Sequence, residues 1–289
     1  MEPGNGSGTA AAAGTEGMVS VVLREGGYAV LSMHKEPVNS LDLAMWRALE
    51  KALDVLEGDQ AVRGLVITTG LKRDVFTAGN DLLELHAPRT SAARYREFWV
   101  TSNRFLKKLH TSRLATIAAI RGACPAGGCM MAMCCDHRVM SSAGTMGLNE
   151  VQLGIPVPKY WGLLMAKLIG TKAADKLLLT GKLVSPGEAK ALGLVDQVVD
   201  KAELLGAAEK VMHQLVKLPP SAVRATKVSL RGDFAAEWAA YYEVEPEGAW
   251  AFLNQPDTLR VLEGALQRLS GKKAQQQQGP PGAPPSSKL

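Results

Sequence analysis

One carboxylate in this sequence is placed where it could move a proton. Glu150 lies in the run GLNEVQLGIP at residues 147–156, where most of its neighbours are apolar. Burial among apolar neighbours raises the pKa of a carboxyl group towards neutrality, and such a group can act as both acid and base. A glutamate on a surface loop is the commoner case. The position of Glu150 by itself therefore leaves both interpretations open.

Two glycine-bearing loops could stabilise the negative charge that such a base creates. The first is FTAGND at residues 76–81 and the second is RGACPAGG at residues 121–128, and each stands between an expected strand and an expected helix. Glycine permits positive φ and close approach of the backbone to a ligand. The start of a helix leaves N–H groups without partners. Two such groups that converge on one point would form an oxyanion hole for a thioester carbonyl.

The segments that must position these loops alternate between strand-like and helix-like runs. Residues 18–24 and 28–32 are rich in β-forming residues on either side of a Glu-Gly-Gly turn, which predicts a hairpin. Ser40 is expected to cap a helix that continues to about residue 57. The other expected elements are strands at 63–69 and 114–120, a helix within 91–110 and a helical region over 201–269. Repeated strand–strand–helix units followed by helices predict an α/β core with a C-terminal helical region.

Composition narrows the class of protein. The chain has 289 residues, of which 46% are hydrophobic and 21% charged, which is typical of a soluble globular protein with a sizeable core. The net charge of +5 is scattered without a basic stripe, so no nucleic acid is expected as a partner and an anionic small molecule fits equally well. Arg121, Pro125 and glycines interrupt the longest apolar run, so no membrane span is expected.

The residue types that bind metals and redox cofactors have unsuitable spacing. The five histidines are dispersed, and the four cysteines fall within residues 124–135 without the paired spacing of a zinc site. We expect the cysteines to be free thiols packed as small hydrophobic side chains. The glycines do not match a dinucleotide-binding fingerprint. The sequence therefore predicts neither a metal nor a redox cofactor.

The two ends of the chain differ in composition from the part between them. Residues 1–17 are mostly Gly, Ala, Ser and Thr without arginine, and are interpreted as a disordered leader. Residues 271–289 are rich in Gln, Pro and Gly, which cannot form a packed core, and are expected to be a flexible tail. The chain ends in Ser287-Lys288-Leu289, which matches a peroxisomal import signal. This tripeptide predicts delivery to the peroxisomal matrix by the peroxisomal import receptor.

Three motifs, taken together, resemble the crotonase (enoyl-CoA hydratase/isomerase) superfamily. They are FTAGNDL at 76–82, RGACPAGGCMMAMCCDHRV at 121–139 and GLNEVQLGI at 147–155. The elements GACPAGGC and GLNExQLGI are typical of the Δ3,Δ2-enoyl-CoA isomerases within it. The resemblance covers about residues 18–270.

The resemblance implies a fold, a substrate and an assembly. The fold is a crotonase-like spiral of β-β-α units over residues 18–200, followed by a helical trimerisation region over 201–270. The substrate is an acyl-CoA, so coenzyme A enters as part of the substrate and no separate cofactor is implied. The expected assembly is a homotrimer, or a hexamer of two trimers.

The resemblance also assigns roles to particular residues. The backbone N–H groups of Asn80 and Gly127 would form the oxyanion hole, and Glu150 would be the proton carrier. Ala78 would contact the adenine of coenzyme A through its backbone, and Lys35 would meet a phosphate. The full set of expected substrate-binding residues is Lys35, Val38, Ala78, Gly79, Asn80, Asp81, Leu82 and Gly127.

One missing acid distinguishes between the reactions of this superfamily. Its hydratases use two glutamates, and Met130 occupies the position of the first, so only Glu150 remains. One base suffices to take a proton from C2 of a 3-enoyl thioester and return it to C4. The sequence therefore predicts a Δ3,Δ2-enoyl-CoA isomerase of unsaturated fatty acid oxidation. Asn149 would either orient the Glu150 carboxylate or shape the turn.

Two alternative functions belong to other classes. One is an enoyl-CoA hydratase or another crotonase reaction that uses the same oxyanion hole, and Met130 is the feature against it. The other is a non-catalytic crotonase-like protein that binds RNA or another protein, which would suit the sequence pI of about 9.0.

Overall fold

An antiparallel hairpin begins the sheet of the computed structural model, which describes residues 17–277 of the chain. Strand β1 (Val19–Arg24) pairs with β2 (Tyr28–Met33) along their whole length. Gly26 and Gly27 turn the chain between them with φ of 95° and 77°, values that side chains disfavour. The predicted hairpin is confirmed.

The rest of the main sheet is parallel. Its strands have the order β1-β2-β3-β4-β6-β8, and each strand from β2 onward is parallel to the next. The new members are β3 (Gly64–Thr69), β4 (Ala115–Ile120), β6 (His137–Ser141) and β8 (Gln197–Val199). Every residue of β4 (ATIAAI) is buried, as expected for a parallel strand that is covered on both faces.

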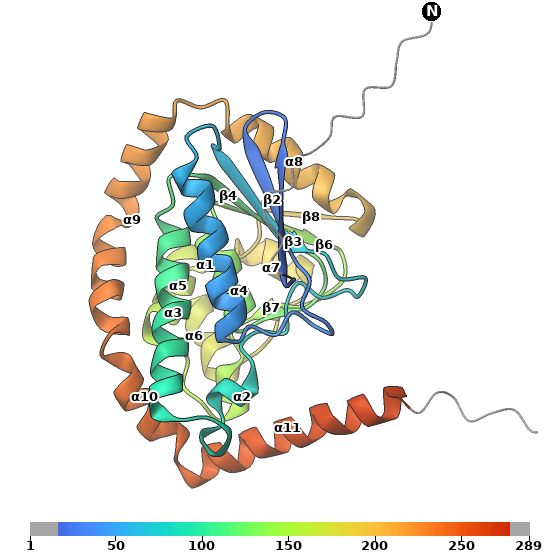
Figure 1. Cartoon of the computed structure of the whole chain (residues 1–289), viewed down its shortest axis with the longest axis vertical. Coiled ribbons are helices and arrows are strands. Elements are labelled where there is room, and N and C mark those ends of the chain that lie inside the picture. Colours follow the sequence, from blue (N-terminus) through green and yellow to red (C-terminus); the bar gives the residue numbers. More distant parts are fainter. Residues whose placement is uncertain (1–16, 278–289) are drawn as a thin grey trace, which may run out of the picture.

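Helices cover both faces of this sheet. Helix α8 packs on β3, β4 and β6 and forms one apolar core with them, while α1, α3 and α4 contribute to a larger core on the other side (Figure 1). The bounds of these helices are α1 (Leu43–Gly58), α3 (Ala92–His110), α4 (Gly127–Cys134) and α8 (Leu204–Leu215). The arrangement confirms the predicted α/β core.

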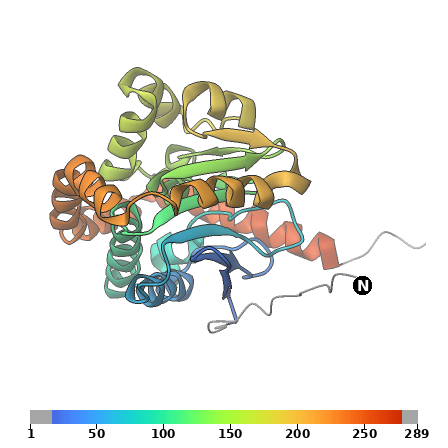
Figure 2. The same ribbon diagram turned by 90° about the horizontal axis from the view of Figure 1, so that it is seen from above.

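The second half of the chain is mainly helical. Helix α9 runs along the outer side of α3 (Figure 2), and α11, which follows α10, runs along one end of the molecule (Figure 1). The remaining helices are α2 (Leu82–Leu85), α5 (Lys159–Ile169), α6 (Thr171–Thr180), α7 (Pro186–Leu192), α9 (Pro220–Tyr242), α10 (Glu245–Leu253), α11 (Pro256–Gln277) and the 3₁₀ turns η1 (Ala87–Arg89), η2 (Glu150–Leu153) and η3 (Lys201–Glu203).

Two helix boundaries differ from those expected. Helix α1 begins at Leu43 with Asp42 as its cap, because the chain stays extended through Leu41 to pair with Asn80. Ser40 does not cap the helix but donates a hydrogen bond to Asp81 at 3.1 Å. At the other end, α11 continues beyond residue 270 to residue 277, because Lys, Ala and Gln favour a helix. Residues 1–16 and 278–289, with the tripeptide Ser287-Lys288-Leu289, lie outside the described residues.

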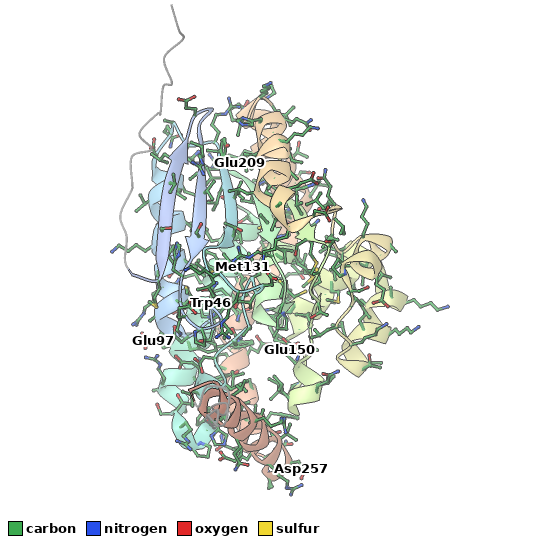
Figure 3. All side chains as sticks on the ribbon, turned by 90° about the vertical axis from the view of Figure 1, so that its right-hand side faces the viewer. Trp46, Glu97, Met131, Glu150, Glu209 and Asp257 are labelled. Atoms are coloured by element: carbon green, nitrogen blue, oxygen red, sulfur yellow. The ribbon has the colours of Figure 1, made fainter. Side chains whose placement is uncertain are left out.

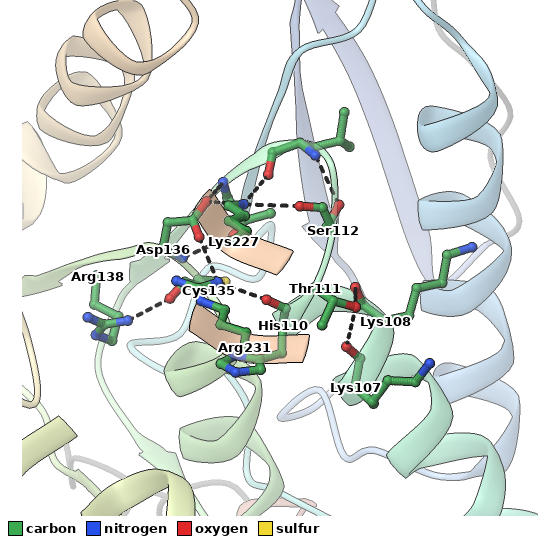
Figure 4. A network of polar contacts seen from close by, with 12 residues as sticks. Lys107, Lys108, His110, Thr111, Ser112, Cys135, Asp136, Arg138, Lys227 and Arg231 are labelled. Carbon is green, nitrogen blue, oxygen red and sulfur yellow. Dashed lines mark hydrogen bonds and ion pairs between the residues drawn. The ribbon is translucent and has the colours of Figure 1, made fainter. Parts of the chain in front are cut away.

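A buried charge cluster attaches α9 to the sheet (Figure 4). Asp136 pairs with Lys227 at 2.6 Å and with Arg231 at 2.9 Å. Lys227 also donates to the carbonyl oxygens of Ser112 and Leu114, at 3.1 and 2.6 Å. Lys227 is only 8% exposed, so its charge depends on these partners.

Replacement of Asp136 is expected to destabilise the fold strongly. Asp136→Asn should lower the free energy of unfolding by about 3–5 kcal/mol, because it leaves two cations near each other without a counter-charge. Chemical denaturation measures this change. Asp233→Asn, at an exposed position of α9, is the matched control and should stay within about 0.5 kcal/mol of the wild type. A similar small loss for both variants would contradict the role given to Asp136.

The four cysteines lie in the apolar core of the structure. Cys124, Cys129, Cys134 and Cys135 are all buried and free, which confirms their predicted packing as small hydrophobic residues. Within residues 17–277, no helix is both long and apolar enough to cross a membrane. In the same part of the chain, no group of His, Cys, Asp and Glu side chains is arranged to hold a metal ion.

Candidate active site

The first glycine-bearing loop is held by the extended segment before α1. Ala78 N–H donates to Val38 O at 2.9 Å, and on the other side of Gly79 the N–H of Asp81 donates to Leu41 O at 3.1 Å. These bonds accompany a parallel bridge between Leu41 and Asn80. In a parallel ladder, neighbouring N–H groups point to opposite sides. The N–H of Asn80 therefore points away from Leu41, towards the side where the second loop lies.

The second glycine-bearing loop lies beside the first. The two loops are joined by a parallel bridge between Val75 and Ala123, and Phe76 N–H donates to Ala123 O at 2.9 Å. Ala126 then adopts φ 49° and ψ −124°, which is strained for a residue with a side chain. It leads directly into Gly127, the first residue of α4, whose N–H has no acceptor inside the helix.

Glycines, which have no side chain, let the two loops touch. A Cβ atom at Gly79 would lie 3.1 Å from Ala126 Cβ and 3.7 Å from the backbone nitrogen of Gly127. A Cβ atom at Gly128 would lie 2.3 Å from Thr77 Cγ2, so only glycine lets α4 approach the first loop this closely. The two N–H groups expected to form an oxyanion hole thus come from loops in direct contact.

Glu150 reaches the same place through a short second sheet. Strand β5 (Cys124–Pro125) pairs with β7 (Met146–Gly147), and Ala126 N–H donates to Gly147 O at 2.8 Å. The chain then turns through Leu148 and Asn149 into η2, of which Glu150 is the first residue. Parallel pairing of β5 with β7 therefore sets the carboxylate beside the start of α4.

The Glu150 carboxylate is buried without partners. The residue is 4% exposed, and neither carboxylate oxygen has a hydrogen-bond partner. Burial raises the pKa of Glu150 to about 7. Asn149 Oδ1 and Asn80 Oδ1 are likewise buried without partners. A site with several unsatisfied polar groups is arranged to receive a ligand.

A cavity of about 920 Å³ connects these groups. It is lined at one end by loop residues that include Val38, Arg73 and Ala78, and in its middle by Asn80 and Glu150. Its other end is lined by side chains of α3, α5 and α10, and Leu266, Leu269 and Ser270 of α11 also line the cavity. Figure 3 shows Glu150 between the sheet and α11. The lining residues come from both halves of the chain and include loop residues as well as aromatic side chains. The cavity can therefore hold a ligand with two chemically different ends.

The structure brings most of the predicted site residues together. Val38, Ala78, Asn80, Asp81, Leu82 and Glu150 line the cavity. Gly79 and Gly127 lie directly behind this lining, where the two loops meet. Lys35 does not line the cavity: its Nζ atom pairs with Asp42 at 2.6 Å and donates to Ser40 O at 3.0 Å. Two exposed cations, Arg73 and Lys159, line it instead.

Sequence reasoning missed the residues at the far end of the cavity. Trp99, Trp161 and Glu245 line it, although they lie on three helices far apart in the chain. Arg73 was missed as well, because a lone arginine before a loop carries no motif. The only signal for Arg73 was that it lies three residues before the FTAGND loop.

The raised pKa of Glu150 predicts that its ionisation destabilises the fold. A folded-state pKa of about 7, above the ordinary value of 4.5, means that the folded protein holds this proton more tightly than the unfolded chain. The corresponding stability is complete below pH 4.5 and is lost as the pH rises through about 7. Glu150→Gln, which cannot ionise, should therefore be more stable than the wild type at pH 8, by on the order of 3 kcal/mol.

Chemical denaturation of both proteins at pH 8 and at pH 5 measures this difference. The gap between wild type and variant should shrink strongly at pH 5, where most of the carboxyl group is protonated. An equal gap at both pH values would show that Glu150 is not held in a site that disfavours its charge.

Comparison with known proteins identifies similar chains. Residues 24–266 match the family model of enoyl-CoA hydratase/isomerase. Mitochondrial enoyl-CoA delta isomerase 1 of Mus musculus is 34% identical, covering 86% of this chain and 85% of the relative. The Homo sapiens protein of the same name is also 34% identical, covering 86% of this chain and 82% of the relative. A putative enoyl-CoA hydratase of Thermus thermophilus is 35% identical, covering 72% and 81%.

A solved structure is similar to this chain in fold. The crystal structure of human mitochondrial delta3-delta2-enoyl-CoA isomerase superposes with a TM-score of 0.85 at 33% identity. The match covers 89% of this chain and 99% of that one. The predicted crotonase fold is therefore confirmed.

The predicted peroxisomal location is wrong. The relatives from mouse, rat and human are named as mitochondrial enzymes, which contradicts it. The prediction depended on the three residues Ser287-Lys288-Leu289 alone. So short a match carries little information compared with similarity over most of the chain.

Proposed function

The chain belongs to the enoyl-CoA hydratase/isomerase family, and from this premise we propose that it is a Δ3,Δ2-enoyl-CoA isomerase. It converts a 3-enoyl-CoA into the trans-2-enoyl-CoA during the oxidation of unsaturated fatty acids. The observation that carries the proposal is the Glu150 carboxylate, which faces the cavity with both oxygens free of hydrogen bonds.

The reaction needs one base that gives its proton back. Glu150 takes a proton from C2, and the electron pair moves to form a dienolate whose negative charge lies on the thioester oxygen. The N–H groups of Asn80 and Gly127 stabilise that oxygen. Protonated Glu150 then delivers the proton to C4, which leaves the double bond between C2 and C3. A pKa of about 7 allows the same group to accept and donate near neutral pH.

The carboxylates of the cavity favour isomerisation over hydration. Met130, at the position where hydratases carry their other glutamate, is fully buried in the core. Asp81 accepts hydrogen bonds from Leu83 N–H at 3.0 Å and from Ser40 at 3.1 Å. Glu245 accepts one from Trp99 at 2.8 Å. Glu150 is therefore the acid among the cavity residues of the described chain that is free to exchange a proton with the substrate.

The remaining roles follow from the two ends of the cavity. Coenzyme A lies along Val38 and Ala78, with the Arg73 cation, rather than Lys35, available to a phosphate. The acyl chain lies in the opposite direction, among the aromatic side chains of α3 and α5. Val228, Leu230 and Val244 of the C-terminal region are 58%, 75% and 62% exposed, which supports the implied homotrimer. The names of the relatives favour a mitochondrial location.

Turnover of two thioesters by the purified chain tests this function. Incubation with trans-3-enoyl-CoA should produce the conjugated 2-enoyl thioester, and incubation with trans-2-enoyl-CoA should give little hydration. Fast hydration with slow isomerisation would establish the hydratase alternative instead. Inactivity in both assays, together with RNA binding that weakens as salt is raised, would favour a non-catalytic crotonase-like protein.

A further inference from the structure

The far end of the cavity has an ordered aromatic wall. The rings of Trp161 and Trp99 stack with centroids 5.6 Å apart, and those of Trp99 and Tyr95 with centroids 5.9 Å apart. Trp161 is also fixed by donating to Asn103 Oδ1 at 3.0 Å. Ring faces held in this way form a surface on which methylene groups of an acyl chain pack well.

A carboxylate interrupts this apolar end. Glu245 is the first residue of α10 and lines the cavity beside the aromatic wall. It accepts a hydrogen bond from Trp99 Nε1 at 2.8 Å, so the same tryptophan forms the wall and positions the carboxylate. Burial raises the pKa of Glu245, while the Trp99 bond and Lys159 lower it. Burial is the largest of these effects, so the pKa of Glu245 lies above its ordinary value.

An acyl chain meets two opposite effects at this end. Each methylene group that lies on the tryptophan rings gains from leaving water. A methylene group that covers Glu245 removes water from a partly buried carboxylate, which is unfavourable. Binding should therefore improve with chain length only until the tail reaches Glu245.

We propose that Glu245, positioned by Trp99, is a specificity-determining residue that makes the cavity discriminate against acyl chains long enough to cover its carboxylate. The inference deepens the proposed function and depends on it only for the identity of the ligand, an acyl-CoA. Lys159 favours the charged form of Glu245, but its Nζ atom lies over the Tyr241 ring, 4.9 Å from the ring centroid, and forms no ion pair with Glu245 among the described residues.

Binding of saturated acyl-CoAs, which cannot react, tests this inference separately from catalysis. Dissociation constants of hexanoyl-CoA and dodecanoyl-CoA are measured by calorimetry for the wild type and for Glu245→Gln. Glutamine keeps an oxygen acceptor for Trp99 N–H but has no charge to desolvate. The preference for the dodecanoyl over the hexanoyl ligand should rise about tenfold in this variant.

Two further variants complete the experiment. Glu247→Gln removes a charge from an exposed position of the same helix and should leave the preference unchanged. Glu245→Leu should change the preference in the same direction as Glu245→Gln, which guards against an effect peculiar to one side chain. A preference that is unaltered in folded Glu245→Gln, or altered equally in Glu247→Gln, would overturn the inference.

The outcome remains distinct from that of the proposed function. Wild-type protein that fails to isomerise any 3-enoyl-CoA would refute the proposed reaction, whatever the binding preference. Wild-type protein that isomerises a hexenoyl and a dodecenoyl thioester with the same relative efficiency as Glu245→Gln would leave the reaction intact and refute the role of Glu245.

Discussion

Glu150→Gln should lower kcat for the conversion of 3-enoyl-CoA to 2-enoyl-CoA by about 10³–10⁴-fold, with a much smaller change in KM. Glutamine has nearly the same shape but cannot take up a proton from C2. No other acid of the described cavity is placed to replace it, since Asp81 and Glu245 are both held by hydrogen bonds. Formation of the conjugated thioester in steady-state assays measures the loss.

Two controls make this result specific to the proton transfer. Glu247→Gln, at an exposed glutamate outside the cavity, should keep wild-type turnover. In deuterated water, the wild type should also exchange the C2 protons of substrate, and Glu150→Gln should lose this exchange together with turnover. An active wild type with an equally active Glu150→Gln would preserve the isomerase function and exclude the single-glutamate mechanism.

Asn80→Pro should lower kcat by about 10²–10³-fold, the usual effect of losing one donor of an oxyanion hole. Proline has no backbone N–H, and the N–H of Asn80 is not used in the bridge to Leu41. The substitution therefore removes the donor to the thioester oxygen while the pairing bonds on either side, from Leu41 N–H and Asp81 N–H, stay available.

Asn80→Ala is the matched variant, because it removes the same side chain but keeps the backbone N–H. It should lose far less activity than Asn80→Pro, and circular dichroism should show that both variants are folded. If the two variants lose activity to the same extent, the Asn80 side chain matters and its backbone N–H does not. That result would remove one of the two donors from the proposed mechanism.

Short-range patterns determined much of the framework from sequence. The hairpin of β1 and β2 follows from alternating β-formers around Gly26 and Gly27, and the buried strand β4 follows from an uninterrupted apolar run. The two glycine-bearing loops and the carboxylate of Glu150 were also identified, because a turn of positive φ, as at Gly79, and a lone acid in an apolar run leave local signatures. Three motifs taken together then indicated the family.

Contacts between distant segments decided the rest. Asp42 rather than Ser40 caps α1, because Leu41 pairs with Asn80 of another loop. Lys35 pairs with Asp42, so Arg73 and Lys159, rather than Lys35, are the cations that line the cavity.

Contacts between distant segments also decided the acyl end of the cavity and the attachment of α9. Glu245 accepts its hydrogen bond from Trp99, which is 146 residues earlier in the chain. Lys227 finds its counter-charge in Asp136 of the segment before β6. No periodicity or turn in the sequence predicts either pairing, because the partners meet only after the sheet and helices have assembled. The sequence by itself therefore determined most of the secondary structure, the two loops and the position of the Glu150 carboxylate in an apolar run. Only the tertiary structure decided which side chains share the cavity, since burial and hydrogen bonding depend on neighbours that are remote along the chain.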